Sequence, residues 1–296
     1  MRQDRPMDFT DRPATLDDAD AIYRLIAANE REWHGQAEVI PDQVAANLSR
    51  PMIQLERDTL VVIAPNGDLA AWAWLHDGKH AQIDVHPSYR GLGIGTRLLD
   101  WAEAGSRARG SEWFAQIVDD ADLAGTELLR SRGCDVLATN WLLERPISSE
   151  QAAAPEGIRL EGYDEARAHE VYELIEAAFA AFQPRRKSFE EWSELTVGRA
   201  TFLPEVSTLA YAGDEVVGAV IALDGEEGYV EQLAVRDDQR NKGIARAMLD
   251  RTCAEFGARG RSTCILWTHS GTGALAMYER LGMRVRRSTT VFRTHL

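Results

Sequence analysis

Apolar and polar positions along the chain fall into two successive series with the same order. Each series starts with a short strand and amphipathic helical segments, in which apolar residues recur every three or four positions. A hairpin of two apolar strands follows, over residues 60–64 and 69–75 and again over 208–211 and 216–223. Each series then reads strand, glycine loop, helix, strand, helix and strand. This order predicts two tandem α/β units with mixed sheets.

A change of composition marks the boundary between the two series. Residues 145–157 are rich in proline, serine, glutamine and alanine, which is typical of a linker. We therefore expect an N-terminal domain over residues 1–147, a linker over 148–157 and a C-terminal domain over 158–296. With 296 residues the chain is long enough for two domains of ordinary size.

The glycine loop of each series has the same short pattern after a strand that ends in valine, Val85 or Val235. At the start of a helix, unpaired backbone N–H groups and the helix dipole together favour an anion. Two such loops with similar flanks predict a duplicated pyrophosphate binder. The two loops lie 150 positions apart and read Arg90-Gly91-Leu92-Gly93-Ile94-Gly95 and Arg240-Asn241-Lys242-Gly243-Ile244-Ala245.

The position of the loop within each series argues against a doubly wound dinucleotide-binding fold. That fold places its glycine fingerprint directly after the first strand. Here each loop comes only after the fourth strand of its series. The element order instead resembles the GNAT superfamily of acetyl-CoA-dependent N-acetyltransferases, as does the late segment Ala274-x-x-x-Tyr278-x-x-x-Gly282-Met283.

This resemblance covers nearly the whole chain, twice, and is similar to the arrangement of tandem GNAT proteins, mycothiol synthases among them. It implies acetyl-CoA as the acetyl donor and no metal. We expect an N-acetyltransferase that acetylates the primary amine of a small molecule by direct transfer in a ternary complex. Two alternatives stay open, a non-catalytic acyl-CoA-binding regulator and an acetyltransferase of protein lysines or N-termini.

The resemblance also implies which residues hold coenzyme A. The pantetheine arm is expected along the strand before the loop, and the pyrophosphate at the loop itself. In the C-terminal domain the expected cofactor-binding residues are Leu233, Ala234, Val235, Arg240, Asn241, Lys242, Gly243, Ile244, Ala245 and Arg246. In the N-terminal domain they are Val85, Arg90, Gly91, Gly93, Gly95 and Thr96.

Acetyl transfer to an amine requires a neutral nitrogen, stabilisation of the carbonyl oxygen and protonation of the departing sulfur. Tyr278 resembles the family's tyrosine that protonates the thiolate. Glu231 is the expected base, directly or through an ordered water, and His269 is the alternative. The N–H of Leu233 is the expected donor to the carbonyl oxygen. The two-residue strand period places Glu231 and Leu233 on one face.

The N-terminal series lacks both proton-handling groups when it is aligned on its loop. Ala81 then stands at the position of Glu231, and Leu129 at the position of Tyr278. We therefore expect the N-terminal domain to be catalytically degenerate. Many GNAT members also carry an asparagine seven residues before the tyrosine, at a position occupied here by Gly271. Ser270 or Thr272 are the candidate substitutes.

The net charge of −14 argues against nucleic-acid and anionic-membrane partners, because both favour a basic surface. The first ten residues are polar, without the apolar core of a secretion signal, and no apolar stretch reaches the length of a membrane span. Three scattered cysteines lack metal-ligand spacing. We expect a cytoplasmic monomer or homodimer.

Overall fold

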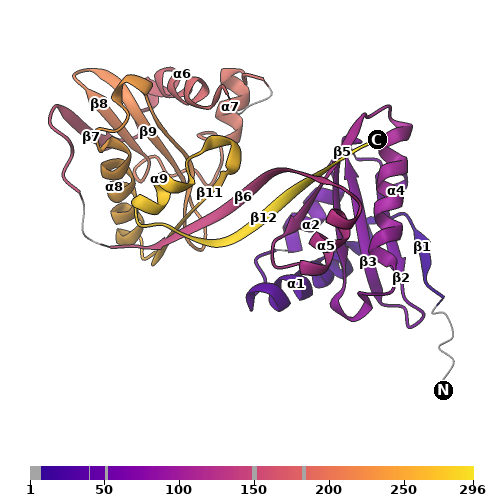
Figure 1. Ribbon diagram of the computed structural model, residues 1–296. Coiled ribbons are helices and arrows are strands. Elements are labelled where there is room, and N and C mark those ends of the chain that lie inside the picture. The colour runs from indigo at the N-terminus through magenta and orange to yellow at the C-terminus, as the bar shows by residue number, and fades with distance from the viewer. Residues whose placement is uncertain (1–7, 40, 51–52, 149–151, 182–184) are drawn as a thin grey trace. The chain divides into compact units, whose positions relative to one another are not determined.

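The structure, a computed structural model, describes residues 8–39, 41–50, 53–148, 152–181 and 185–296. These residues form two compact units, each an α/β unit as expected. Unit 1 contains the described residues of Met1–Thr139 together with Thr289–Leu296, and unit 2 is formed by Asn140–Ser288. Figure 1 shows the elements of each unit. The strands and helices expected from the sequence are present in the expected order.

Unit 1 has a mixed sheet with helices on both faces. Its strands follow the spatial order β1 (Thr10–Arg12), β2 (Thr59–Ile63), β3 (Leu69–His76), β4 (His80–Val85), β5 (Trp113–Asp119) and β12 (Arg284–His295). Helices α1 (Ala19–His34) and α2 (Pro41–Leu48) contribute to one apolar cluster, and α4 (Ile94–Ala108) and α5 (Leu123–Ser131) to others. The short α3 (Leu55–Asp58) leads into β2.

Unit 2 repeats this architecture. Its strands follow the order β6 (Asp135–Pro146), β11 (Thr263–His269), β10 (Gly228–Val235), β9 (Glu215–Leu223), β8 (Thr208–Ala212) and β7 (Ile158–Gly162). Helices α6 (Ala168–Phe179) and α7 (Phe189–Leu195) pack on one face of the sheet. Helices α8 (Ile244–Ala258) and α9 (Leu275–Arg280) pack on the other.

The closing strands of the two series are exchanged. Strand β6 follows α5 in the chain but pairs antiparallel with β11, from Thr263↔Pro146 to His269↔Asn140. Strand β12 follows α9 but pairs with β5, from Thr289↔Asp119 to His295↔Trp113. The compact units therefore do not coincide with the domains expected over residues 1–147 and 158–296. Strands β6 and β12 are each the last strand of their series. Each can therefore occupy the place of the last strand in the sheet of the other series. Of the expected linker, residues 149–151 lie outside the described part.

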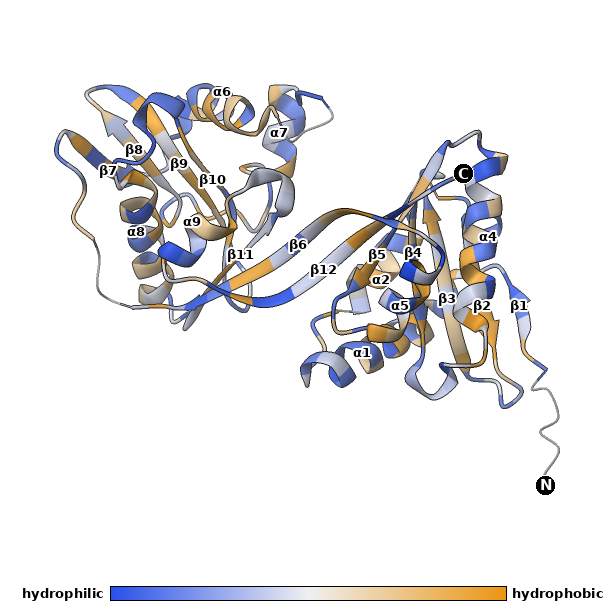
Figure 2. Cartoon of the chain, viewed as in Figure 1, coloured by the Kyte–Doolittle hydropathy of each residue, from blue (hydrophilic) through white to orange (hydrophobic). Residues whose placement is uncertain are grey.

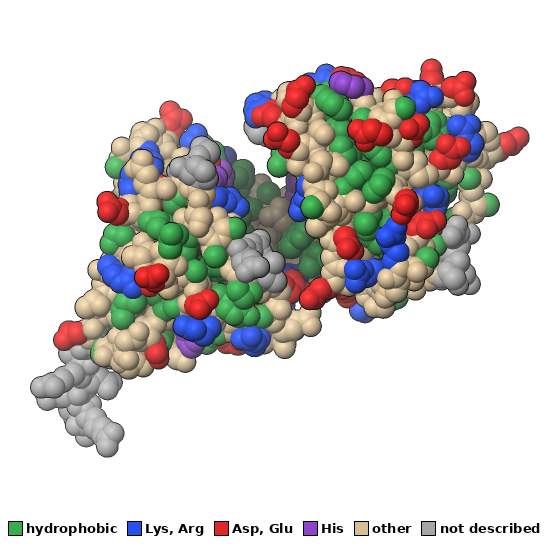
Figure 3. Space-filling model, turned by 180° about the vertical axis from the view of Figure 1, so that it is seen from behind, with side chains coloured by type: hydrophobic (Ala, Val, Ile, Leu, Met, Phe, Trp, Pro, Cys, Tyr) green, Lys and Arg blue, Asp and Glu red, His purple; other side chains and the backbone are tan. Residues whose placement is uncertain are grey.

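The helices after the glycine loops show why apolar spacing predicted them. In α8 the side chains of Ile244, Met248, Leu249 and Phe256 are buried, and these positions recur at helical spacing. Figure 2 shows apolar residues along α4 and α8 beside polar ones. No described helix is long and apolar enough to cross a membrane. On the face seen in Figure 3, acidic and basic side chains are interspersed over each unit.

Candidate active site

A β-bulge in β10 shapes the site of unit 2. Strand β10 runs parallel to β11 but pairs with it only at Gly228↔Cys264 and Tyr229↔Ile265. Directly afterwards the register of β10 against β9 shifts between Val230 and Gln232, so that Glu231 is an extra residue. A bulge bends its strand. Beyond this bend both strands line a cavity of about 600 Å³.

Because of the bulge, the side chain of Glu231 does not lie on the face of the sheet expected from the sequence. Leu233 packs in the same apolar cluster as Val230, on the side of α8. Glu231 instead lies near Arg199, with 3.8 Å between its Oε2 and the arginine Nη1. The expectation that Glu231 and Leu233 share a face was wrong, because the inserted residue interrupts the two-residue period.

The same bulge corrects the alignment of Glu231 with Ala81. In unit 1 the register of β3 and β4 is continuous from Ala71↔Val85 to His76↔His80. Ala81 pairs with Leu75 there, as Val230 pairs with Ala222 in unit 2. Ala81 therefore corresponds to Val230, and unit 1 has no residue equivalent to Glu231.

The alignment of Leu129 with Tyr278 is confirmed by the hydrogen bonds that end their helices. The N–H of Met283 donates to the Tyr278 carbonyl at 3.1 Å, and the N–H of Cys134 donates to the Leu129 carbonyl at 3.1 Å. Both side chains are buried, at 7 % and 2 % exposure. The two repeats therefore place a phenol and an isobutyl group at one structural position.

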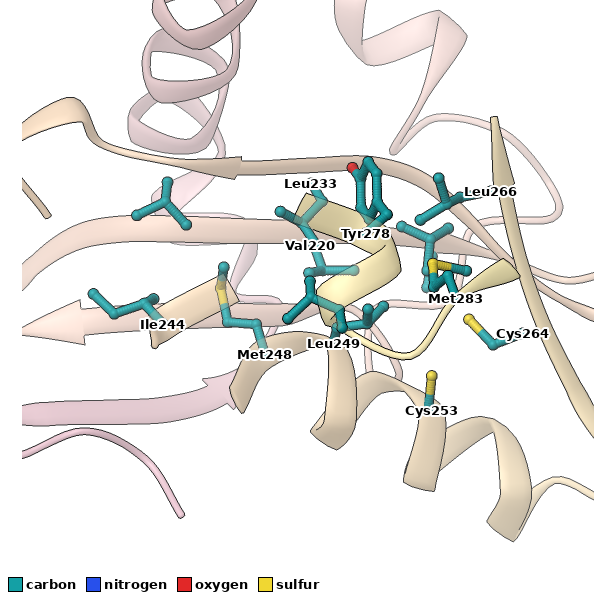
Figure 4. Packing of buried hydrophobic residues seen from close by; sticks show 14 of the residues in the cluster. Val220, Leu233, Ile244, Met248, Leu249, Cys253, Cys264, Leu266, Tyr278 and Met283 are labelled. Atoms are coloured by element: carbon teal, nitrogen blue, oxygen red, sulfur yellow. The ribbon is translucent and has the colours of Figure 1, made fainter. Parts of the chain in front are cut away.

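The hydroxyl of Tyr278 lies at the edge of an apolar cluster, with the ring beside the strand that carries Leu233 (Figure 4). No group among the described residues forms a hydrogen bond with this hydroxyl. Burial raises the pKa of Tyr278 from its ordinary value of 10.0 to about 12, because a phenolate is poorly solvated there. The hydroxyl is therefore neutral and free to donate a hydrogen bond.

The raised pKa of Tyr278 predicts how kcat depends on pH in the alkaline range. The protonated, donating form of Tyr278 persists as long as the pH stays well below about 12. For the acetyl transfer to an amine that the sequence predicts, we expect kcat to rise with pH as that amine loses its proton, and then to remain level up to pH ~10. A pH profile of kcat for the wild type and Tyr278→Phe tests this. A decline between pH ~8 and ~9.5 that vanishes in the variant would contradict the assignment.

The strand beside Tyr278 directs backbone donors into the cavity. The N–H of Arg236 donates to the Val217 carbonyl of β9 at 2.9 Å. Donors of an antiparallel ladder alternate along a strand, so the N–H of Ala234 also faces β9. Those of Leu233 and Val235 then face away from β9, toward the cavity that both residues line. Leu233 thus has the orientation required of an oxyanion donor.

The glycine loop after β10 has the geometry of an anion cradle. Asn241 and Gly243 adopt positive φ values of 63° and 85°, and in unit 1 Gly91 and Gly93 adopt 77° and 78°. The first helical bond of α8 runs from the N–H of Ala247 to the Gly243 carbonyl, at 3.1 Å. Among the described residues, the N–H groups of 241–246 have no protein acceptor. All these residues except Lys242 line the cavity.

The arginine that opens each loop fastens it to the preceding strand. Arg240 Nε donates to the Val235 carbonyl at 3.2 Å, and Arg90 Nε donates to the Val85 carbonyl at 3.4 Å. Arg240 also pairs with Asp237 at 2.6 Å. The charge of Arg240 is therefore partly neutralised. Its bond to the Val235 carbonyl also holds the loop in position beside β10. Lys242 bonds Gln239, with 2.9 Å between Nζ and Oε1.

The segment after β11 has Gly271 at the position where many family members carry an asparagine. A Cβ at Gly271 would lie 3.0 Å from Nδ1 of His269, so a larger residue there would require a small shift of this imidazole, which itself lines the cavity. Thr272 also lines the cavity, whereas Ser270 does not. The Thr272 hydroxyl donates to the His269 carbonyl at 2.8 Å and accepts from the Ala274 N–H at 3.1 Å. Of the two candidate substitutes, only Thr272 reaches the site.

Two residues near Glu231 carry no signal in the sequence. Arg199 comes from the segment after α7, far from the glycine loop in the chain. Burial and the neighbouring charge of Glu231 raise the pKa of Tyr229, because a phenolate there would be poorly solvated and repelled by the carboxylate. Glu231 remains partly exposed, with 26 % of its side chain accessible, and lines the cavity. It can therefore exchange protons with a ligand or a water there.

Unit 1 contains a smaller version of the same cavity, of about 360 Å³. The wall next to the loop includes Leu129 in place of a tyrosine. The expected cofactor-binding residues of this unit all line it, namely Val85, Arg90, Gly91, Gly93, Gly95 and Thr96. Unit 1 thus has the cradle without the phenol or the bulge glutamate.

This fold, with a glycine loop between a strand and a helix in each unit, is that of the N-acetyltransferase class of acyltransferases. The chain belongs to the acetyltransferase (GNAT) family, whose sequence profile matches residues 20–133 and 168–283. It is an N-acetyltransferase with tandem domains.

Comparison with known proteins gives relatives along most of the chain. The mycothiol acetyltransferase of Thermobispora bispora is 27 % identical over 233 residues, which cover 73 % of this chain and 76 % of the relative. A GCN5-related N-acetyltransferase from Sphaerobacter thermophilus superposes with a TM-score of 0.81 at 25 % identity, covering 97 % of this chain and 95 % of the other. A tandem GNAT protein from the clavulanic acid biosynthesis pathway has the same fold, with a TM-score of 0.72, 17 % identity and coverage of 97 % and 98 %.

Proposed function

We propose that unit 2 transfers an acetyl group from acetyl-CoA to the primary amine of a small molecule, by direct attack in a ternary complex. The observation that carries this proposal is the single cavity lined by Glu231, Leu233, Tyr278 and the glycine loop. These are the groups that acetyl transfer to an amine requires. Unit 1 is proposed to retain a cradle and to lack catalysis.

The residues present fit acetyl-CoA. The unpaired amides of residues 241–246 suit a diphosphate, and Gly243 starts α8 with a φ of 85° that keeps the backbone accessible. The outward N–H groups of Leu233 and Val235 suit an extended amide arm, which would add to β10 like a strand. Acetyl-CoA, when bound, supplies an activated acetyl group as a thioester.

The side chains of unit 2 divide the proton transfers between them. Glu231 accepts the proton of the incoming ammonium group, directly or through a water, and the partly exposed carboxylate can pass it on. The Leu233 N–H stabilises negative charge on the carbonyl oxygen. As the C–N bond forms and the C–S bond breaks, the Tyr278 hydroxyl donates a hydrogen bond to the departing thiolate, and the second proton of the attacking nitrogen neutralises that thiolate. Because the Tyr278 pKa of about 12 is above that of a thiol, the hydroxyl acts first as a hydrogen-bond donor.

Replacement of Glu231 tests the proposed base. We expect Glu231→Gln to lower kcat by about tenfold or more, since the amide keeps the size but accepts no proton at neutral pH. The measurement is amine-dependent release of free thiol from acetyl-CoA. His269→Gln is the matched variant for the alternative base. If His269→Gln lowers kcat and Glu231→Gln keeps the wild-type kcat, the base is His269.

The small-molecule acceptor is favoured by the relatives. The curated relatives that cover most of the chain carry the name mycothiol acetyltransferase. A further relative, 31 % identical over 114 residues, is an aminoalkylphosphonate N-acetyltransferase of Salmonella typhimurium. These acetyltransferase relatives leave no support for a purely regulatory role of the whole chain. Thiol release with a panel of small amines, against lysine peptides, separates the two acceptor classes.

A further inference from the structure

We propose that the β3–β4 hairpin of unit 1 binds a divalent transition-metal ion through His76, Asp77 and His80. These three residues are close in the chain, but only the hairpin brings their donors together. None of them lines either cavity described above. The site is thus separate from the proposed acetyl-transfer chemistry, for which the sequence predicted no metal.

The donor atoms of the three side chains lie close together. One ligand atom from each side chain can be chosen so that all lie within 4.8 Å of one another. His80 Nδ1 lies 3.1 Å from both carboxylate oxygens of Asp77, and His76 Nδ1 lies 3.7 Å from Oδ2. A zinc ion bonds imidazole nitrogens and carboxylate oxygens at about 2.0–2.2 Å. Small side-chain rotations would therefore place the three donors around one ion.

The backbone of the hairpin holds these side chains in place. His76 and His80 are directly paired across β3 and β4. Asp77 adopts a positive φ of 51°, which is uncommon for a residue with a side chain, and Gly78 follows at 73°. Ser111 Oγ donates to the Gly78 carbonyl at 2.9 Å, and the Ala115 N–H donates to the Lys79 carbonyl at 2.7 Å. The turn is thus fixed to β5.

A tryptophan orients each of the two imidazoles. The rings of Trp74 and His76 meet edge to face with centroids 5.5 Å apart. The rings of His80 and Trp113 do the same at 5.8 Å. Such contacts limit the rotation of the histidine rings, so less conformational entropy is lost on binding. They also place two fluorophores next to the proposed ion.

The donor set selects the class of metal. Two imidazoles and one carboxylate suit Zn²⁺, Ni²⁺ or Cu²⁺ and are a poor match for Ca²⁺ or Mg²⁺, which prefer oxygen ligands. The side chains are 42 % (His76), 42 % (Asp77) and 46 % (His80) exposed. An ion there is open to water, which can complete its coordination.

Titration of the full-length, untagged protein with Ni²⁺ tests the proposal. Tryptophan fluorescence and calorimetry should report one saturable site, with quenching because Trp74 and Trp113 lie close to the paramagnetic ion. His76→Ala and His80→Ala should each weaken binding about tenfold or more. His86→Ala is the matched control, because His86 directly follows the other end of β4, and it should bind as the wild type does.

Zn²⁺ should compete with Ni²⁺ for the site and reverse the quenching, because both ions accept the same donors. Circular dichroism should show the variants folded, since the replaced side chains are exposed. The absence of a saturable site would overturn the proposal. So would a Ni²⁺ affinity that neither His76→Ala nor His80→Ala reduces, or one that His86→Ala reduces equally.

Discussion

Tyr278→Phe is expected to lower kcat by about a hundredfold while the KM for acetyl-CoA changes little. The substitution removes one oxygen from a ring that is 7 % exposed and keeps the packing of the ring in its cluster. The hydroxyl has no hydrogen-bond partner among the described residues, so its removal leaves no group unsatisfied. The loss should therefore appear in the chemical step and not in stability. Steady-state kinetics and a thermal melt measure the two separately.

Leu129→Ala is the matched substitution at the equivalent position of unit 1. It should destabilise unit 1 by about 2–5 kcal/mol, because a side chain that is 2 % exposed leaves a cavity. At a temperature where the variant is folded, its kcat should stay near the wild-type value. Comparable losses of kcat in Tyr278→Phe and Leu129→Ala would contradict the proposal that only unit 2 is catalytic.

Phe292→Ala is expected to lower the free energy of unfolding of unit 1 by about 3–5 kcal/mol. Unit 1 should therefore unfold at a lower temperature or denaturant concentration. Phe292 lies on β12 at the C-terminal end of the chain, and its side chain is 1 % exposed. It packs with residues of β3, β4 and β5 in an apolar cluster of unit 1. Hydrogen exchange followed by mass spectrometry should show the loss of protection in β5, and strand β10 of unit 2 should keep its protection.

Val285→Ala provides the control on the same strand. Val285 belongs to unit 2 and is 41 % exposed, so its replacement should change the free energy of unfolding by less than about 1 kcal/mol. If Phe292→Ala instead lowered protection in β10 and spared β5, the observed pairing of β12 with β5 would be wrong.

Much of this molecule could be predicted from local signals in the sequence. Apolar spacing located α8, and the repeated loop located both cradles, because each depends on residues close in the chain. The alignment of Leu129 with Tyr278 was correct for the same reason. A glycine four residues later, Gly133 or Gly282, ends each helix with a positive φ, which fixes the register locally.

The features that the sequence did not predict depend on contacts between distant segments. The bulge at Glu231 appears only when β10 is paired with β9. Counting residues back from the loop therefore aligned Ala81 with Glu231, although Ala81 corresponds to Val230. The exchange of β6 and β12 leaves no local signal, because equivalent strands have similar apolar patterns. His76 and His80 look like isolated histidines until the hairpin pairs them across its two strands.

A crystal structure of the protein with acetyl-CoA tests the central claim most directly. The account predicts diphosphate density against the backbone N–H groups of residues 241–246, with the thioester sulfur within hydrogen-bonding distance of the Tyr278 hydroxyl. Diphosphate density only at the loop of unit 1, or a sulfur turned away from Tyr278 toward solvent, would contradict it.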